Sequence, residues 1–251
     1  GEYGEGKMSS PRQIFVYLKN YFDQKDLVKN KNLKALVTTG PTREYLDPIR
    51  YISNESSGKQ GYEIALALKR LGVKTKLITG PTNLNYENQL KIKKIVSARD
   101  MMIEVKKSLP VDIAVCAAAV SDYKPINKSK NKIKKNSFHK KSISLEKNPD
   151  ILNYLSKNNQ VRPKIVVGFS AETENVIHNS KIKIKEKYCD LIIANDVSRK
   201  NFGFNSEYNK VSIIDKNGRV KSIPKNKKSY IANTIAKIIL DKLLVNDKNF
   251  N

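Results

Sequence analysis

A polar stretch between residues 39 and 61, TGPTREYLDPIRYISNESSGKQG, holds the most distinctive chemistry of the sequence. It follows an apolar segment, leads into an amphipathic one and contains Ser56, Ser57 and Gly58. Hydroxyls and the free N–H groups of a helix start bind anions, although Ser56 alone is more typical of a helix cap. The stretch is neither G-x-G-x-x-G nor G-x-x-x-x-G-K-[ST]. It therefore predicts an anion site that lacks the dinucleotide and Walker A motifs.

Two lysines, Lys183 and Lys187, are spaced four residues apart in the predicted helix 173–188. Residues at this spacing share one helix face, so the two ammonium groups could bind phosphates together. The same spacing is common on solvated helix faces. The pattern alone leaves both interpretations open.

The basic segment 124–141, KPINKSKNKIKKNSFHKK, is almost free of apolar residues. Its central cations repel one another, so we expect a mobile loop that an anion could order. Lys132 lies near its centre and is a candidate for closing over such an anion.

Histidines and cysteines offer little chemistry. His139 and His178 stand apart from other ligand-type residues, and Cys116 and Cys189 lie in or beside apolar runs. Zinc sites and disulfide frameworks need more ligands at closer spacing. We predict no metal site and two buried structural thiols in a reducing compartment.

Apolar periodicity predicts strands that alternate with helices. The predicted strands are 34–39, 73–79, 112–120, 164–169 and 190–194, and the predicted helices are 61–71, 98–108, 173–188 and 229–244. A further helix is expected to start at Asn148-Pro149-Asp150, with Asn148 as its cap. Asn217-Gly218 predicts a hairpin that joins 211–214 to 220–223.

This order of elements predicts an α/β fold: a doubly wound, mainly parallel, Rossmann-like three-layer sheet with an antiparallel hairpin near one edge. Ligands of such sheets bind at the carboxyl ends of the strands. The polar stretch 39–61 follows one such end, which is where a site is expected.

Composition limits the class of protein. The 251 residues include 48 Lys and Arg against 24 Asp and Glu, a net charge of +24. Such a charge attracts polyanions, but the lysines are spread over the chain and no interleaved aromatic and glycine pattern of RNA-binding modules occurs. No apolar run approaches the roughly 20 residues that span a bilayer, and no signal pattern opens the chain. We expect a cytoplasmic protein that binds small molecules rather than nucleic acid or membrane.

A resemblance to a known family sharpens this expectation. The stretch 39–61 is similar to the signature of bacterial phosphopantothenoylcysteine synthetases, the phosphopantothenate–cysteine ligases. Further family motifs follow in order: AAAVSDYKP (117–125), NKIKK (131–135), KNPDIL (147–152), VGFSAET (167–173), LIIANDVS (191–198) and GFNSEYNKV (203–211). The resemblance implies an enzyme that joins 4′-phosphopantothenate to cysteine with CTP and Mg²⁺ through an acyl-cytidylate, in coenzyme A biosynthesis. It also implies a homodimer, for which the hairpin 211–223 is the expected pairing element.

Residue roles follow from the same resemblance. Asn54 matches the family's loop asparagine, which serves capture of the acyl-cytidylate, and Lys132 matches the lysine of a flap that closes over CTP. Both are expected to be catalytic. The expected nucleotide-binding residues are Ser56, Ser57, Gly58, Cys116, Ala117, Ala118, Asp122, Lys132, Asn148, Pro149, Asp150, Ile151, Phe169, Lys183 and Lys187.

The first residues carry a separate resemblance. GEYGEGKMSSPRQI is similar to the tail of the flavin-dependent phosphopantothenoylcysteine decarboxylase, which bacteria often fuse in front of the ligase. We therefore expect residues 1–30 to be the tail or linker of a decarboxylase domain that lies upstream and holds FMN, and residues 31–251 to be the ligase domain of a bifunctional protein.

Two alternatives remain at this level. A nucleotide-binding oxidoreductase would fit the fold, although the sequence lacks the glycine fingerprint and has Lys76 and Leu77 where an acidic residue is expected. A basic nucleic-acid-binding module would show affinity that falls steeply with salt. Sequence physics does not decide between CTP and ATP.

Overall fold

An eight-stranded sheet forms the centre of the protein, in the order β12-β11-β10-β9-β6-β1-β4-β5. The computed structural model describes residues 8–15, 17–18, 30–86, 90–134, 142–157, 160–198 and 206–248. The strands of the sheet are β1 (Lys34–Thr39), β4 (Lys74–Thr79), β5 (Lys91–Lys94), β6 (Ile113–Cys116), β9 (Ile165–Glu172), β10 (Leu191–Asp196), β11 (Tyr208–Asp215) and β12 (Val220–Lys227). The strands from β5 to β10 pair in parallel, and β11 and β12 add antiparallel at one edge. The predicted mainly parallel sheet and its edge hairpin are confirmed.

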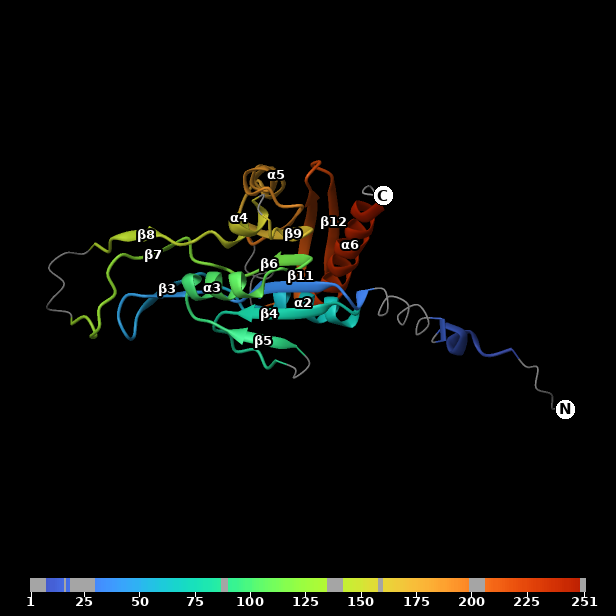
Figure 1. The fold of residues 1–251 in the computed structure, drawn as a ribbon, viewed down its shortest axis with the longest axis horizontal. Helices are drawn as coiled ribbons and strands as arrows, with labels where there is room; N and C mark the ends of the chain where they lie inside the picture. Colours follow the sequence, from blue (N-terminus) through green and yellow to red (C-terminus); the bar gives the residue numbers. More distant parts are fainter. Residues whose placement is uncertain are drawn as a thin grey trace.

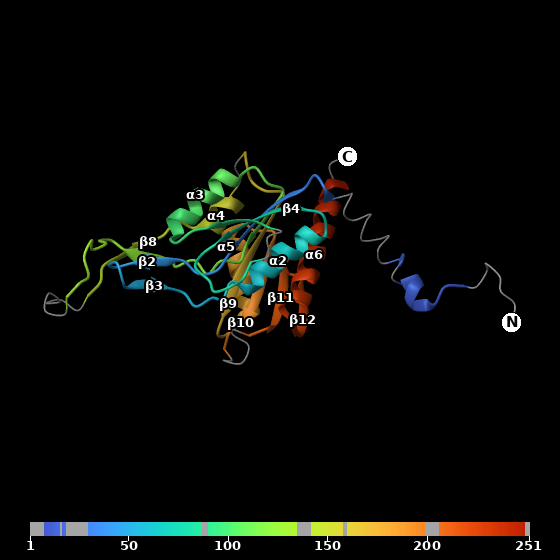
Figure 2. The same cartoon turned by 90° about the horizontal axis from the view of Figure 1, so that it is seen from below.

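Helices cover both faces of the sheet (Figures 1 and 2). They are α2 (Lys59–Arg70), α3 (Ala98–Ser108), α4 (Ile151–Ser156), α5 (Val176–Lys187) and α6 (Lys228–Lys248). One core cluster joins α2 and α6 to the sheet, and a second joins α3, α4 and α5 to the other face. In β1, Val37 belongs to the first cluster and its neighbour Leu36 to the second, because successive strand residues point to opposite faces. The predicted three layers are therefore present.

Two boundaries were predicted wrongly. The strand expected over 112–120 ends at Cys116. Ala117 to Val120 stay beside the end of β1 through an isolated bridge between Pro41 and Ala119, and they line cavities. Their apolar character reflects this lining and not strand burial. The helix expected to be capped by Asn148 begins at Ile151, and its cap is Asp150, whose Oδ1 accepts from the N–H of Asn153 at 2.9 Å.

Asn148 has a different role. Its Nδ2 donates to the carbonyl oxygen of Ser121 at 2.9 Å, and its N–H donates to that of Asp122 at 2.8 Å. The side chain and backbone together fasten the approach to α4 onto the segment that follows β6. Capping needs a free side-chain acceptor near the first helical N–H groups, and here Asp150 supplies it.

Two antiparallel ribbons, which the sequence did not reveal, protrude from the body on the same side (Figure 1). One pairs β2 (Arg43–Tyr45) with β3 (Tyr51–Ser53), and the other pairs β7 (Tyr123–Pro125) with β8 (Leu145–Lys147). The expected loop over 124–141 is thus wrong at its start, and its residues 135–141 lie outside the described part. Ladder hydrogen bonds are made by the backbone, so a strand can form without an apolar pattern.

The sheet has its topological switch point between β1 and β6. From β1 the chain proceeds through β4 and β5 on one side and then returns to β6 on the other. Crevices that hold ligands form outside the carboxyl ends of strands at such a point. None of the helices in the described part of the chain is long and apolar enough to cross a membrane.

Candidate functional site

Two adjoining cavities, of about 450 and 590 Å³, open at the carboxyl ends of the central strands. Both volumes fall in the range that holds small molecules, roughly 300–1,000 Å³. The residues common to both linings are Ala118, Val120, Asp122, Phe169 and Lys183. A ligand in one cavity would therefore meet a ligand in the other across a shared wall.

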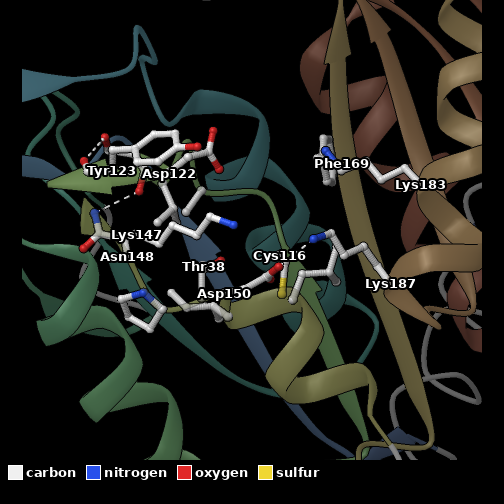
Figure 3. A pocket seen from close by; sticks show the side chains of 16 residues that line it. Thr38, Cys116, Asp122, Tyr123, Lys147, Asn148, Asp150, Phe169, Lys183 and Lys187 are labelled. Carbon is white, nitrogen blue, oxygen red and sulfur yellow. Dashed lines mark hydrogen bonds and ion pairs between the residues drawn. The ribbon is translucent and has the colours of Figure 1, made fainter. Parts of the chain in front are cut away.

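The first cavity lies between the segment after β6, the start of α4 and the lysines of α5 (Figure 3). Lys183 and Lys187 both line it, as their spacing on one helix face suggested. Lys187 Nζ donates to Asp150 Oδ2 at 2.6 Å, and this bond raises the pKa of Lys187. Lys183 is half-buried and has no acidic partner among the described residues. The two ammonium groups thus differ: one is paired and the other is available to a ligand.

The opposite wall of this cavity is polar (Figure 3). It includes Asp122, which is exposed, and Asn148, whose Oδ1 is buried and has no hydrogen-bond partner in the described part of the chain. Pro149, Ile151 and Phe169 add apolar surface. The cavity combines flat apolar surface, an unpaired acceptor and a cation, which suits a nucleotide better than a purely apolar ligand.

Neither cysteine side chain of the protein can act as a nucleophile at this cavity. Cys116 lines it and is half-buried, so the expectation of full burial is wrong for this thiol, whereas Cys189 is buried. Burial raises the pKa of each thiol to about 12. Only the thiolate is a good nucleophile, so neither cysteine is one at neutral pH.

The second cavity is lined by the loop before α2, and its first wall is the predicted anion segment. Gly58 has φ +73°, which a residue with a side chain rarely adopts, and α2 starts there without a side-chain cap. Ser56 Oγ accepts from the N–H of Gly58 at 3.2 Å, so Ser56 shapes the loop and does not cap the helix. The hydroxyls of Ser56 and Ser57 line the cavity, and Ser57 Oγ also accepts from the N–H of Lys59, the first residue of α2, at 3.5 Å.

Close packing holds this loop against the sheet. The carbonyl oxygen of Gly58 accepts from Thr39 Oγ1 at 2.6 Å. At Gly61, a Cβ would lie 2.4 Å from the same Oγ1 and 3.1 Å from the Cβ of Ala117. Only glycine allows α2 to start this near the ends of β1 and β6. The position of the anion segment thus depends on a contact that no other residue type permits.

Asn54 lies where the loop meets the segment after β6. Its Nδ2 donates to the carbonyl oxygen of Val120 at 3.0 Å, and Val120 belongs to the wall that both cavities share. The Asn54 side chain is exposed to the second cavity. An amide in this place can contact a group that lies between two ligands.

Lys132 is the one predicted site residue that lines neither cavity. It is exposed, and its neighbour Ile133 is held at the turn of the β2–β3 ribbon, where the N–H of Ile133 donates to Asp47 Oδ2 at 3.2 Å. Asp47 is fully buried and also accepts from the N–H groups of Ile49 and Arg50 at 2.8 Å each. The bond from Ile49 is the main cause that lowers the pKa of Asp47. Ile133, next to Lys132, is therefore fastened to the turn of this ribbon.

Three residues that sequence reasoning missed also line the second cavity: Asn195, Asn209 and Lys228. Lys228 is only 4% exposed, and burial, with a smaller effect of Lys59, lowers its pKa to about 8. In the sequence it is one of several lysines in KNKK, so nothing marks it as buried. Its position depends on how α6 packs beside α2, which only the fold determines.

Metal-ligating clusters do not occur in the described residues: no group of three or more His, Cys, Asp or Glu could hold an ion. His178 lies on α5 and lines neither cavity, and His139 lies outside the described residues.

Comparisons with known proteins identify the family of this chain. Residues 30–243 match the family model of the DNA/pantothenate metabolism flavoprotein C-terminal domain. The chain is 42% identical over 236 residues to the "Coenzyme A biosynthesis bifunctional protein CoaBC" of Borreliella burgdorferi, which covers 93% of this chain and 58% of that protein. The chain thus spans somewhat over half the length of this relative.

Solved structures give the same result. The crystal structure of the C-terminal domain of a coenzyme A biosynthesis bifunctional protein CoaBC superposes with a TM-score of 0.70 at 33% identity, over 86% of this chain and 97% of that one. A Cab2 mutant, H337A, in complex with phosphopantothenate-cysteine shares the fold, with a TM-score of 0.69 at 16% identity over 97% of each chain. The family match covers most of the chain, so the resemblance inferred from the motifs is confirmed. The chain belongs to the family of DNA/pantothenate metabolism flavoprotein C-terminal domains.

Proposed function

We propose that this chain is a phosphopantothenate–cysteine ligase, which joins 4′-phosphopantothenate to cysteine with CTP. The observation that carries the proposal is the pair of cavities with a shared wall, one beside the lysines of α5 and the other beside the anion segment before α2. A nucleotide and a phosphorylated acid can each occupy one cavity and react across that wall. The names of the relatives, which place them in coenzyme A biosynthesis, support the same reaction.

The first step would join the two substrates. A carboxylate oxygen of phosphopantothenate attacks the α-phosphorus of CTP, the new P–O bond forms, and pyrophosphate leaves with the electrons of the broken bond. Several negative charges come together in this step, so the protein must supply cations and fixed donors. Lys183 and Lys187 line the nucleotide cavity and can supply the charge.

The second step would capture the acyl-cytidylate. The amine of cysteine attacks the acyl carbon, CMP leaves, and the nitrogen loses a proton as the amide forms. We assign Asn54 to this step because its amide is fixed at the wall between the cavities, where it can orient the acyl carbonyl.

The base would lie in the first cavity, against Phe169 and the residues from Cys116 to Ala118. The buried Oδ1 of Asn148, which has no partner in the described residues, can accept from an exocyclic amino group. Such a group occurs in cytosine and also in adenine, so the preference for CTP over ATP rests on the family resemblance. Asp122, exposed on the same wall, completes the expected base-binding set.

Lys132 would act as the lysine of a flap. It lies on the chain between β7 and β8, outside both cavities, so the ribbon must move or bend for its ammonium group to reach the phosphates. Closure of this kind excludes water from the reacting groups. Mg²⁺ would be held by the phosphate oxygens and water, because the described residues form no cluster that could cage it.

A homodimer and a fused decarboxylase with FMN complete the proposal, with the cytoplasm as its location. The hairpin β11–β12 was the expected pairing element, yet its edge strand carries Pro224 and several lysines, which disfavour edge pairing. The two protruding ribbons instead expose Ile49, Tyr123, Ile126 and Leu145. We propose that the ribbons, rather than the hairpin, form the dimer contact.

Pyrophosphate release in the presence of phosphopantothenate, cysteine and each of the four nucleotides tests the function. Turnover that requires all three substrates and favours CTP is the expected result. Equal rates with ATP would correct the nucleotide, and no release with any nucleotide would refute the ligase. Binding of NAD or NADP without binding of CTP would support the oxidoreductase alternative.

A further inference from the structure

The loop that carries Asn54 lies between two cavities. Residues 53–57 line the second cavity, and the same residues line a third cavity of about 480 Å³, which residues 81–84 also line. A loop with a cavity on each side has few packed neighbours, so the contacts at its two ends must fix its position. At the first end, Ser53 Oγ donates to the carbonyl oxygen of Thr42 at 2.7 Å.

At the other end of the loop, the methyl group of Thr82 packs against two glycines. Gly40 and Gly58 have φ +71° and +73°, and a Cβ added to either would lie 2.8 Å from Thr82 Cγ2. The methyl group therefore occupies the space that side chains at both positions would need. Because Gly58 ends the loop and directly precedes α2, this contact limits how far the loop can move toward residues 81–84.

Tyr86 fixes the orientation of Thr82. Its hydroxyl oxygen lies 2.6 Å from Thr82 Oγ1 and 2.8 Å from Thr79 Oγ1, and Thr79 Oγ1 donates to the carbonyl oxygen of Gly80 at 2.9 Å. Each hydroxyl has one hydrogen, so Thr79 accepts from Tyr86, and Tyr86 accepts from Thr82. The oxygen and the methyl group of threonine share one Cβ, so the bond that holds the oxygen also holds the methyl group against the glycines.

Aromatic packing holds Tyr86 itself. Its ring lies edge-on to the ring of Tyr62 in α2, with the centroids 5.2 Å apart, and Lys94 Nζ lies 5.9 Å from the Tyr86 centroid. Tyr86 therefore connects three parts of the protein, namely α2, the end of β4 at Thr79 and the residues 81–84.

We propose that Tyr86 and Thr82 are positioning residues for the second step of the reaction. Tyr86 orients Thr82, the methyl group of Thr82 holds Gly58, and the loop thereby keeps the Asn54 amide at the wall between the first two cavities. Neither Tyr86 nor Thr82 lines those cavities, so both act through the loop and not by contact with a substrate. The link to the second step rests on the proposed function, whereas the positioning of the loop rests on the contacts alone.

Three substitutions separate the roles of the hydroxyl and methyl groups. Tyr86→Phe removes the hydroxyl and keeps the ring, Thr82→Ser removes the methyl group, and Thr82→Val keeps a methyl group against the glycines without the oxygen. Tyr86→Phe and Thr82→Ser should slow amide formation in single-turnover reactions roughly tenfold, within the hundredfold that a misplacement of about 1 Å can cost. Pyrophosphate release should slow less, and the KM of CTP should stay as in the wild type, because the first cavity is not touched.

The double variant Tyr86→Phe, Thr82→Val tests whether the hydroxyl acts through the methyl group. It should recover the wild-type rate of amide formation although it lacks both hydroxyls, because valine presents a methyl group in the place of Thr82 Cγ2. Tyr230→Phe is the control, since Tyr230 is exposed on α6 and lines none of the three cavities, and it should change no rate. A merely structural role of Tyr86 would slow both steps alike, and the valine would not restore them.

Three results would overturn the inference. One is a wild-type rate of amide formation in Tyr86→Phe or Thr82→Ser, and another is slowing of pyrophosphate release by the same factor as amide formation. The third is a double variant that stays as slow as Tyr86→Phe. If one of the two single variants does not fold, the other gives the same test, because both act on the contact with Gly58.

Hydrogen exchange in the absence of substrates tests the positioning without turnover. The N–H groups of residues 53–58 should exchange faster in Tyr86→Phe and Thr82→Ser than in the wild type, and at the wild-type rate in Thr82→Val and Tyr230→Phe. Equal exchange in all of these proteins would overturn the inference. If exchange follows this pattern but the wild-type enzyme forms no product with any nucleotide, the positioning is supported and the proposed function is refuted.

Discussion

The two lysines of α5 should contribute unequally to nucleotide binding, although both line the same cavity. Lys187 already donates to Asp150 at 2.6 Å, and both partners are partly exposed, whereas Lys183 has no acidic partner among the described residues. A hydrogen bond between charged groups contributes about 1.5–3 kcal/mol, so Lys183→Met should weaken CTP binding roughly tenfold to hundredfold. Lys187 must give up part of an ion pair that is worth about 0.2–1 kcal/mol. Lys187→Met should therefore lose less affinity than Lys183→Met, by a factor of up to about five.

The same two lysine substitutions should also be compared in a protein that carries Asp150→Asn. Asparagine caps helices as well as aspartate does, so α4 should remain folded while the charge opposite Lys187 disappears. In this background the two lysine substitutions should become equal in cost, because Lys187 no longer has a competing partner. Titration calorimetry with CTP alone, at constant salt, measures all of these affinities.

Lys181→Met is the matched control, since Lys181 is exposed on the same helix and lines neither cavity. A loss of CTP affinity as large as that of Lys183→Met would assign the effect to the net charge of +24 and not to the site. If Lys187→Met is the costlier substitution with Asp150 present, the reasoning about the paired ammonium group is wrong.

Three further substitutions test other parts of the site. Gly61→Ala should cost about 1–3 kcal/mol of stability and raise substrate KM values, because its Cβ would displace Thr39 at the second cavity. Gly218→Ala is the control, because Gly218 lies in open space at φ +79°. It should cost about 1–2 kcal/mol of stability and leave every KM unchanged. Unfolding curves and steady-state rates decide between these outcomes, and equal KM effects would refute the packing argument. Asn54→Ala should release pyrophosphate and accumulate the acyl-cytidylate in mass spectra, whereas loss of pyrophosphate release would move Asn54 to the first step. Lys132→Gln should slow the first step without loss of stability. Hydrogen exchange should show that CTP protects residues 128–134 in the wild type and protects them less in the variant. Protection that does not change with CTP would exclude closure of the flap.

The sequence predicted the sheet well because its central strands are short apolar runs between helices with one apolar face. The residues at which the strands end were less predictable. Residues 117–120 are as apolar as β6, yet they line cavities, and apolar character does not distinguish a lining residue from a core residue. The ribbons were missed because Tyr123–Pro125 and Leu145–Lys147 pair through their backbones and have no apolar alternation to reveal them.

The candidate site was predicted in the same uneven way. Ser56 to Gly58 and the α5 lysines could be found because local spacing marks them. The pairing of Lys187 with Asp150 joins residues 37 positions apart, and Lys228 reaches its cavity only because α6 packs beside α2. Such contacts depend on the tertiary fold, and a run of lysines in the sequence does not show which of them becomes buried.

The most direct measurement of the central claim follows the carboxylate oxygen of phosphopantothenate. If that carboxylate attacks the α-phosphorus of CTP, a heavy-oxygen label in the carboxylate must appear in CMP after the amide forms, and pyrophosphate must remain unlabelled. Mass spectrometry of the products from single-turnover reactions gives the distribution of the label. The proposed reaction predicts one labelled oxygen in CMP, whereas label in inorganic phosphate with CDP as the second product would show attack at the γ-phosphorus and contradict it.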